Sequence, residues 1–278
     1  MDEIKVMSLV GCNVQQSELI DLVTNLQVYD INGESGPLNL TRFGRDGDGG
    51  YVVVEKSFDN ADILMSYGIA GDSSFEEAFV NKYKKDAYGF DCSIESVSTN
   101  NDLFHFVPEC ISSGDFISKG TKSSMKITTF LQQVNTLKLE DKNIFIKMDI
   151  EGAEYNAWSD ILSLKDQITG VAMELHLRSR EDLPRAIKLT DELKQHFYLV
   201  NVHGNNCPKP RRATFDEIPG SSDRLPVLLE LTYINKDLVT SAVISEDQSH
   251  PSKYDMPNCN HYSELKFNLA LKQECLAV

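Results

Sequence analysis

Three carboxylates follow one apolar run and stand close enough together to do acid–base or ligand chemistry. The run over 144–148 ends in Asp149, Glu151 and Glu154, with Gly152 between them. A buried parallel strand delivers side chains in this way to the carboxyl edge of a sheet, where open α/β proteins place ligands. A solvated turn would tolerate the same residues, but so many acids at one strand tip favour a site.

A second candidate site begins where the run over 63–67 meets Gly68. Gly68 and Gly71 permit a tight turn and the close approach of a ligand. The S-x-x-E pattern over 73–76 predicts a capping box at the start of a helix. Asp91 ends the next predicted strand, 23 positions after Gly68. An acid at about that spacing holds the hydroxyls of a ribose, so a nucleoside-bearing cofactor is indicated.

The glycine turn favours S-adenosylmethionine over a nicotinamide dinucleotide. The dinucleotide pattern G-x-G-x-x-G requires glycine where this chain has Ala70. Asp72 would repel a pyrophosphate, whereas a cofactor that is cationic at sulfur tolerates it. The predicted cofactor-binding residues are Gly68, Ala70, Gly71, Asp91 and Asp149.

Several of these segments occur in the order found in one enzyme family. They are 47–53, 67–76, 88–91, 147–154, 174–176 and 202–206. In this series the chain resembles the FkbM-like S-adenosylmethionine-dependent methyltransferases, over roughly residues 40 to 235. It is most similar to the branch with a Gly-Gly-Tyr segment ahead of the fold. The resemblance implies a seven-stranded Rossmann-like methyltransferase sheet and O-methylation of a hydroxyl on a small molecule or glycan.

One departure from that family keeps other functions open. Tyr67 stands where methyltransferases often place an acid that holds the amino acid portion of the cofactor. A non-catalytic nucleoside-binding module with the same fold is therefore an alternative. An NAD(P)-dependent oxidoreductase is a further alternative, which Ala70 and Asp72 disfavour.

Methyl transfer to a hydroxyl requires alignment of the acceptor and a group that takes its proton. We predict Asp149, His176 and Glu151 as the catalytic residues, because all three fall at predicted strand ends or junctions on the carboxyl edge. Glu154 is a supporting acid, and His203 is the next candidate.

A metal ion is the secondary hypothesis for the same edge. Asp149 with Glu174 or His176, and Asn205 or Asn206, could provide an oxygen-rich set of ligands for magnesium. The sequence does not fix the spacing of these side chains, so an acid–base mechanism without metal is preferred.

The remaining chain must supply the elements that position these residues. Apolar strands alternate with helical patterns from residue 62 onward, which predicts an α/β fold with a mostly parallel sheet, helices on both faces and an antiparallel hairpin at one edge. We predict an N-terminal helical extension over 1–40, a methyltransferase domain over 41–244, and a C-terminal tail or lid over 245–278 with weak helical character at 263–275.

The composition restricts the partners and the compartment. The net charge of −15 makes nucleic acid an unfavourable substrate. The chain has no run of 18 apolar residues and begins without the features of a secretory signal. Its six cysteines are scattered without a C-x-x-C pair, which argues against a zinc ribbon and a disulfide framework. We therefore expect a cytoplasmic protein; the oligomeric state is not indicated.

Overall fold

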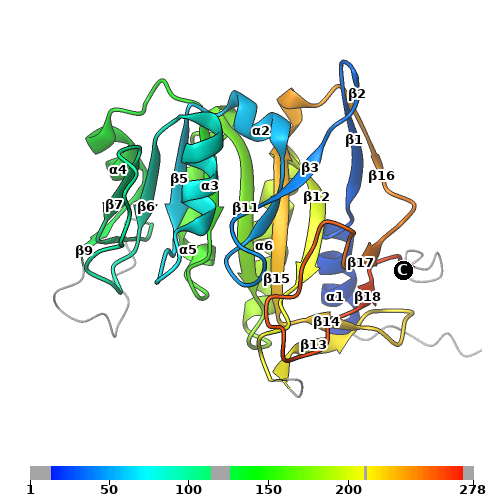
Figure 1. Ribbon diagram of the computed structural model, residues 1–278. Coiled ribbons are helices and arrows are strands. Elements are labelled where there is room, and N and C mark those ends of the chain that lie inside the picture. The colour runs from blue at the N-terminus through cyan, green and yellow to red at the C-terminus, as the bar shows by residue number, and fades with distance from the viewer. Residues whose placement is uncertain (1–13, 114–125, 210–211, 272–278) are drawn as a thin grey trace, which may run out of the picture.

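A seven-stranded sheet forms the centre of the molecule (Figure 1). The computed structural model describes residues 14–113, 126–209 and 212–271. The strands, in their order across the sheet, are β7 (Phe104–Val107), β6 (Ala87–Phe90), β5 (Ile63–Tyr67), β10 (Ile144–Met148), β11 (Ile168–His176), β15 (Leu228–Asn235) and β12 (Phe197–Gly204). Only β15 runs antiparallel to its neighbours, β11 and β12. This is the Rossmann-like methyltransferase sheet, and the predicted fold class is confirmed, including the antiparallel hairpin at one edge.

Helices cover both faces of this sheet because its strands are apolar on both sides (Figure 1). They are α1 (Val14–Asn25), α2 (Glu55–Asn60), α3 (Ser74–Tyr83), α4 (Phe130–Leu137), α5 (Glu154–Leu162) and α6 (Asp182–His196). Successive side chains of β5 serve opposite faces: Leu64 joins the core under α2 and α3, whereas Met65 joins the core under the other four helices. Trp158 of α5 lies fully buried in this second core.

The parallel strands all end at one edge, and the predicted site residues follow those ends. Gly68 comes directly after β5, Asp91 after β6 and Asp149 after β10, while His176 is the last residue of β11. Residues far apart in the sequence therefore meet at the carboxyl edge of the sheet, as open α/β folds require of a ligand site.

Small sheets and two short 3₁₀ helices surround the central sheet. They are β1 (Tyr29–Gly33) with β2 (Gly36–Pro37) and β16 (Ser241–Ile244), β3 (Leu40–Phe43) with β4 (Tyr51–Val54), β8 (Glu109–Ile111) with β9 (Lys126–Thr128), β13 (Thr214–Glu217) with β14 (Arg224–Pro226), β17 (Ser249–His250) with β18 (Phe267–Asn268), and the helices η1 (Lys165–Gln167) and η3 (Lys236–Leu238). α1 packs against α6, and β1 pairs with β16. The division at residues 40 and 244 stays a prediction.

The C-terminal segment differs from the sequence prediction. No helix forms over 263–271, the described part of the predicted helix over 263–275; the chain is extended there and contains β18. Phe267 and Leu269 are buried, so the apolar residues that suggested a helix instead anchor an extended chain on the main body.

Two disulfides contradict the prediction of a chain without a disulfide framework. Cys92 is bonded to Cys110, and Cys207 to Cys259. Their separations of 18 and 52 residues form no recognisable local motif, because the partners lie on loops, on β8 and on the C-terminal segment, which only the folded chain brings together. The cysteine argument for a cytoplasmic setting therefore fails. A membrane-spanning helix is absent from the described residues, whose helices fall short in length and apolar character.

Candidate functional site

A cavity of about 440 Å³ opens at the carboxyl edge, where β5, β6 and β10 end. It is lined by Asp48, Tyr67, Gly68, Ala70, Phe90, Asp91, Ser93, Cys110, Ile111, Asp149, Ile150, Glu151 and Ala153. Four of the five predicted cofactor-binding residues are in this lining, and Gly71 is not. Of the predicted catalytic residues, Asp149 and Glu151 border the same cavity as the cofactor turn, and His176 does not.

The turn after β5 requires glycine. Gly68 has a φ of +81°, and a Cβ there would lie 1.7 Å from the carbonyl oxygen of Asp149. The buried Lys147 donates from Nζ to the carbonyl of Gly68 at 2.7 Å, which fixes the turn from the neighbouring strand. The chain thus passes so close to β10 that no larger residue fits.

Asp91 is held in place by the turn that it faces. Its Oδ2 accepts a hydrogen bond from the backbone N of Ala70 at 2.8 Å, and its Oδ1 accepts from the backbone N of Ser93 at 2.7 Å. Each carboxylate oxygen can accept more than one hydrogen bond, so capacity remains toward the cavity. This geometry fits the role predicted for Asp91, which is to hold a pair of ribose hydroxyls.

The helix after the glycine turn begins where predicted, but without a capping box. Ser73 is the N-cap residue of α3 and makes no capping hydrogen bond through its side chain. Glu76 is buried and accepts from the hydroxyl of Ser66 on β5, so it cannot fold back to the N-cap. Asp72 takes the capping role, since its Oδ1 accepts from the backbone N of Ser74 at 3.1 Å.

Tyr67, the departure from the methyltransferase pattern, forms part of the cavity wall. Its ring stacks on Phe90 at 5.1 Å between centroids, and its hydroxyl donates to Gln133 Oε1 at 2.8 Å. A buried tyrosine with its hydroxyl satisfied acts as an apolar surface. It provides no carboxylate for the amino group of a methionine.

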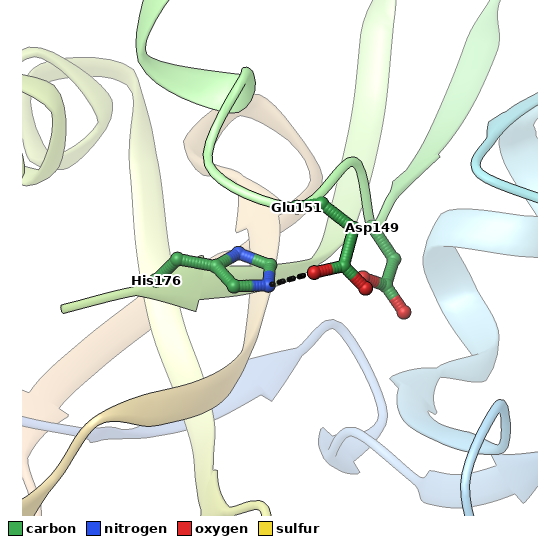
Figure 2. Close-up of side chains that lie close together, drawn as sticks. All are labelled: Asp149, Glu151 and His176. Atoms are coloured by element: carbon green, nitrogen blue, oxygen red, sulfur yellow. Dashed lines mark ion pairs between the residues drawn. The ribbon is translucent and has the colours of Figure 1, made fainter. Parts of the chain in front are cut away.

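The three predicted catalytic residues lie together beside this cavity. Figure 2 shows the side chains of Asp149, Glu151 and His176 pointing toward one another. One donor atom from each lies within 4.8 Å of the others. The dashed line in Figure 2 marks the 3.7 Å ion pair between His176 Nε2 and Glu151 Oε2.

Two buried glutamates fix the imidazole of His176. Glu154 Oε1 accepts from the backbone N of His176 at 3.0 Å and lies 3.1 Å from Nδ1. Glu174 Oε2 lies 3.1 Å from Nε2, yet Nε2 makes no hydrogen bond. Burial alone lowers the pKa of His176, but Glu154 and Glu174 outweigh it and raise that pKa to about 10.

Glu174 connects His176 to the neighbouring strand ends. Burial, then repulsion from Asp149, raises the pKa of Glu174 to about 7 against the opposing effect of His176. Its Oε1 accepts from Asn205 Nδ2 at 2.7 Å. Asn206 faces away and donates to backbone carbonyls of the C-terminal segment. Of the predicted metal ligands, Asp149, Glu174, His176 and Asn205 therefore gather at one place, and Asn206 does not.

Glu151 occupies an unusual backbone position at this edge. Its φ is +60°, in the left-handed region that non-glycine residues seldom adopt. Its side chain is 74% exposed and pairs with the guanidinium of Arg178. Strain of this kind persists where surrounding structure enforces it, and it frequently marks functional sites.

Two further residues of the site were not predicted individually. Tyr51, the first residue of β4, donates from its hydroxyl to Asp149 Oδ2 at 2.9 Å. Burial and the charge of Asp149 raise the pKa of Tyr51 well above its usual value, so the hydroxyl remains a donor. Asp48 lines the cavity from the preceding turn. The sequence signal for this region is the glycine-rich segment over 47–53, which contains both residues.

His203, the alternative catalytic candidate, is fully enclosed. Its Nδ1 lies 2.8 Å from Glu230 Oε2, and its Nε2 lies 3.0 Å from Glu264 Oε1. Both ring nitrogens are therefore in hydrogen bonds, and the side chain has no exposed surface. Neither His203 nor His176 is in the cavity lining, so the free ring nitrogen rather than exposure distinguishes the two.

Comparison with known proteins adds little to this geometry. No protein family matches the sequence, and no curated protein matches it. A Streptococcus mutans protein named as a methyltransferase and solved in complex with SAH is similar over 65% of this chain and 92% of its own, with 12% identity and a TM-score of 0.34. Fibrillarin, solved in a protein complex, is similar over 74% of this chain and 97% of its own, with 9% identity and a TM-score of 0.34. These scores are too low to support an argument about this protein.

Proposed function

We propose that this protein is an S-adenosylmethionine-dependent methyltransferase that methylates a hydroxyl oxygen of a small molecule or glycan. The observation that carries the proposal is that Asp91 and Asp149 line the same cavity. Asp91 holds the ribose of the cofactor, and Gly68 allows the backbone to approach it. The sulfonium methyl then faces the edge that carries Asp149.

The start of α3 favours this cofactor over a dinucleotide. A pyrophosphate binds to free backbone N–H groups at a helix N-terminus. Here the carboxylate of Asp72 already accepts from the N–H of Ser74 and pairs with Arg45 at 3.1 Å. An anionic phosphate group would have to displace Asp72, whereas S-adenosylmethionine carries no phosphate.

The proposed reaction is an in-line displacement at the methyl carbon. The acceptor oxygen forms the new C–O bond as the S–C bond breaks, and the sulfonium becomes the thioether of S-adenosylhomocysteine. The hydroxyl proton passes to the carboxylate of Asp149, which Tyr51 holds in position by its hydrogen bond. His176 and Glu151 complete the acceptor side of the cavity.

The acceptor class follows from the charge of the protein. A net charge of −15 disfavours nucleic acid, and the carboxylates at this edge accept hydrogen bonds from hydroxyl groups. A small polyhydroxylated molecule or a glycan therefore fits better than a polyanion.

Two measurements test the proposal. Calorimetric titration with S-adenosylmethionine, S-adenosylhomocysteine and NADH should give binding of the first two alone. Incubation with S-adenosylmethionine and mixtures of small hydroxyl compounds and glycans should then release S-adenosylhomocysteine. Binding without turnover against every mixture would favour the non-catalytic module, and preferential binding of NADH would favour an oxidoreductase.

A further inference from the structure

We infer that Asp149, Glu151 and His176 form a binding site for one divalent transition-metal ion of the Mn²⁺ type at the rim of the cofactor cavity. Among the residues that the structure describes, these are the only His, Cys, Asp or Glu side chains found to bring three donor atoms within 4.8 Å of one another. Binding of the ion does not depend on the proposed function. Only a role of the ion in methyl transfer rests on that function.

A cluster of acidic residues alone would not indicate a metal site, but the buried ring of His176 adds a second, independent observation. Its side chain is 1% exposed, and its Nε2 makes no hydrogen bond, although it lies 3.1 Å from Glu174 Oε2 and 3.7 Å from Glu151 Oε2 (Figure 2). A buried imidazole nitrogen without a hydrogen bond costs free energy unless a ligand satisfies it. The atom lies close to carboxylate oxygens of Asp149 and Glu151, which would share the ion.

The other nitrogen of the ring has the partner that metal-binding histidines need. A ligating histidine commonly donates its second N–H to a carboxylate, which fixes the tautomer and the ring orientation. Glu154 Oε1 lies 3.1 Å from Nδ1. Glu154 is itself fully buried and fixed, because its Oε2 accepts from the backbone N of Gly152 at 2.8 Å. Nε2 is thereby left as the ligand atom.

The geometry needs only a small adjustment to close around an ion. Ligand atoms about 2.1 Å from one ion lie roughly 3–4.3 Å apart. The three donor atoms already lie within 4.8 Å, and Glu151 is 74% exposed and free to rotate. Its ion pair with Arg178 is at the surface, where solvent screens it, so releasing that pair costs little free energy.

The charge and the donor types select the kind of ion. Asp149, Glu151 and the buried Glu174 place excess negative charge around one imidazole, and buried carboxylates are usually paired or bound to metal. Carboxylate oxygens alone would suit Mg²⁺, but an imidazole nitrogen favours transition ions such as Mn²⁺ or Zn²⁺. The ion would sit against Asp149, which also lines the cofactor cavity, and a hydroxyl bound to it would lose its proton more readily.

Mn²⁺ binding to the full chain, without cofactor or acceptor, tests the inference. The loss of the free Mn²⁺ signal in electron paramagnetic resonance counts bound ions, and nitrogen coupling in the bound spectrum reports an imidazole ligand. We expect one ion per chain in the parent protein. Glu151→Gln and His176→Gln should each weaken binding at least tenfold, and His176→Gln should remove the nitrogen coupling. Glu264→Gln, which alters the glutamate facing His203, is the matched control and should bind as the parent does.

The outcomes separate this inference from the proposed function. Glu151→Gln is the decisive variant because its side chain is exposed and its loss leaves the fold intact. The metal site is overturned if the parent does not bind Mn²⁺. It is also overturned if Glu151→Gln and His176→Gln bind Mn²⁺ as tightly as the parent does. Calorimetry with S-adenosylmethionine on the same samples tests the function separately: Mn²⁺ binding without cofactor binding would support the metal site and contradict the methyltransferase.

Discussion

His176 is the last residue of β11 and His203 the next to last residue of β12, two strands that β15 separates in the same sheet, and both histidines are buried between two glutamates. They differ in what their rings leave unsatisfied. His203 has a hydrogen bond at each nitrogen, and Glu264, one of its partners, comes from the C-terminal segment that the Cys207–Cys259 disulfide attaches to the main body. His176 has one nitrogen that makes no hydrogen bond.

The two rings differ as a histidine with a structural role would differ from the metal-binding histidine that we propose. Burial lowers the pKa of both, but the flanking glutamates outweigh it and raise the pKa of both to about 10, so electrostatics alone does not distinguish them. What distinguishes them is the second ring nitrogen: Nε2 of His176 makes no hydrogen bond and lies close to carboxylate oxygens of Asp149 and Glu151, whereas both nitrogens of His203 are in hydrogen bonds. The predictions that follow test this contrast, beginning with the largest effect.

Asp149→Asn should have the largest effect, on turnover. Loss of a proton acceptor reduces the rate by about 10²–10⁴-fold. The amide has the same shape, so the affinity for S-adenosylmethionine should change by less than about threefold. Release of S-adenosylhomocysteine and calorimetric titration measure the two quantities. Turnover within a small factor of the parent would assign the proton transfer elsewhere.

His203→Gln should act on stability instead. Removing one partner of a buried ion pair leaves glutamates uncompensated and destabilises a fold by about 3 kcal/mol. Chemical denaturation should show this loss, while cofactor affinity remains that of the parent. A fall in cofactor affinity in the folded variant would contradict the structural role that the enclosed ring implies.

The pH dependence of the stability lost in His203→Gln gives an independent check of the structural role. Burial lowers the pKa of His203, but Glu230 and Glu264, which face it directly, and the nearby Asp255 outweigh burial and raise its folded pKa to about 10. His250 also lies near it, and the two imidazoles oppose each other's protonation. Since the folded pKa of His203 exceeds the unfolded value of about 6.5, the stabilisation is complete below pH 6.5 and disappears as the pH rises through 10. The stability difference between parent and His203→Gln should therefore shrink from pH 6 to pH 10.

Asp91→Ala tests whether the cofactor end is independent of both histidines. Loss of two charge-assisted hydrogen bonds to a ribose should weaken S-adenosylmethionine binding by about 1.5–3 kcal/mol. Stability should change little, because Asp91 is only partly buried. Calorimetric titration of the folded variant measures this affinity. If Asp91→Ala binds S-adenosylmethionine as tightly as the parent does, Asp91 is not a cofactor-binding residue.

Glu151→Gly should have the smallest effect, and in the opposite direction. Glycine adopts the positive φ at this position without strain, so the free energy of unfolding should rise by about 0.5–1 kcal/mol. The same change removes a predicted metal ligand, and Mn²⁺ binding should fall together with turnover. Thermal denaturation checks the gain, and a less stable variant would show that the backbone there is not strained.

The sequence by itself determined the architecture and the cofactor end. Strand and helix periodicities are local, because each strand here buries both faces and each helix buries one, and the carboxyl ends of parallel strands must meet at one edge. Gly68, Asp91 and Asp149 could therefore be placed together from their positions alone, and they line one cavity.

Only the tertiary structure decided which side chains complete the site. Tyr51 reaches Asp149 across 98 positions, and Glu264 reaches His203 across 61. Neither contact, nor the pairing of Cys92 with Cys110, follows any periodicity, because each depends on how loops and the C-terminal segment return to the sheet. Those returning segments determine whether a histidine near a strand end has hydrogen bonds at both ring nitrogens or at only one. In the sequence both His176 and His203 come at the end of an apolar run, and the contacts that make them differ come from distant segments.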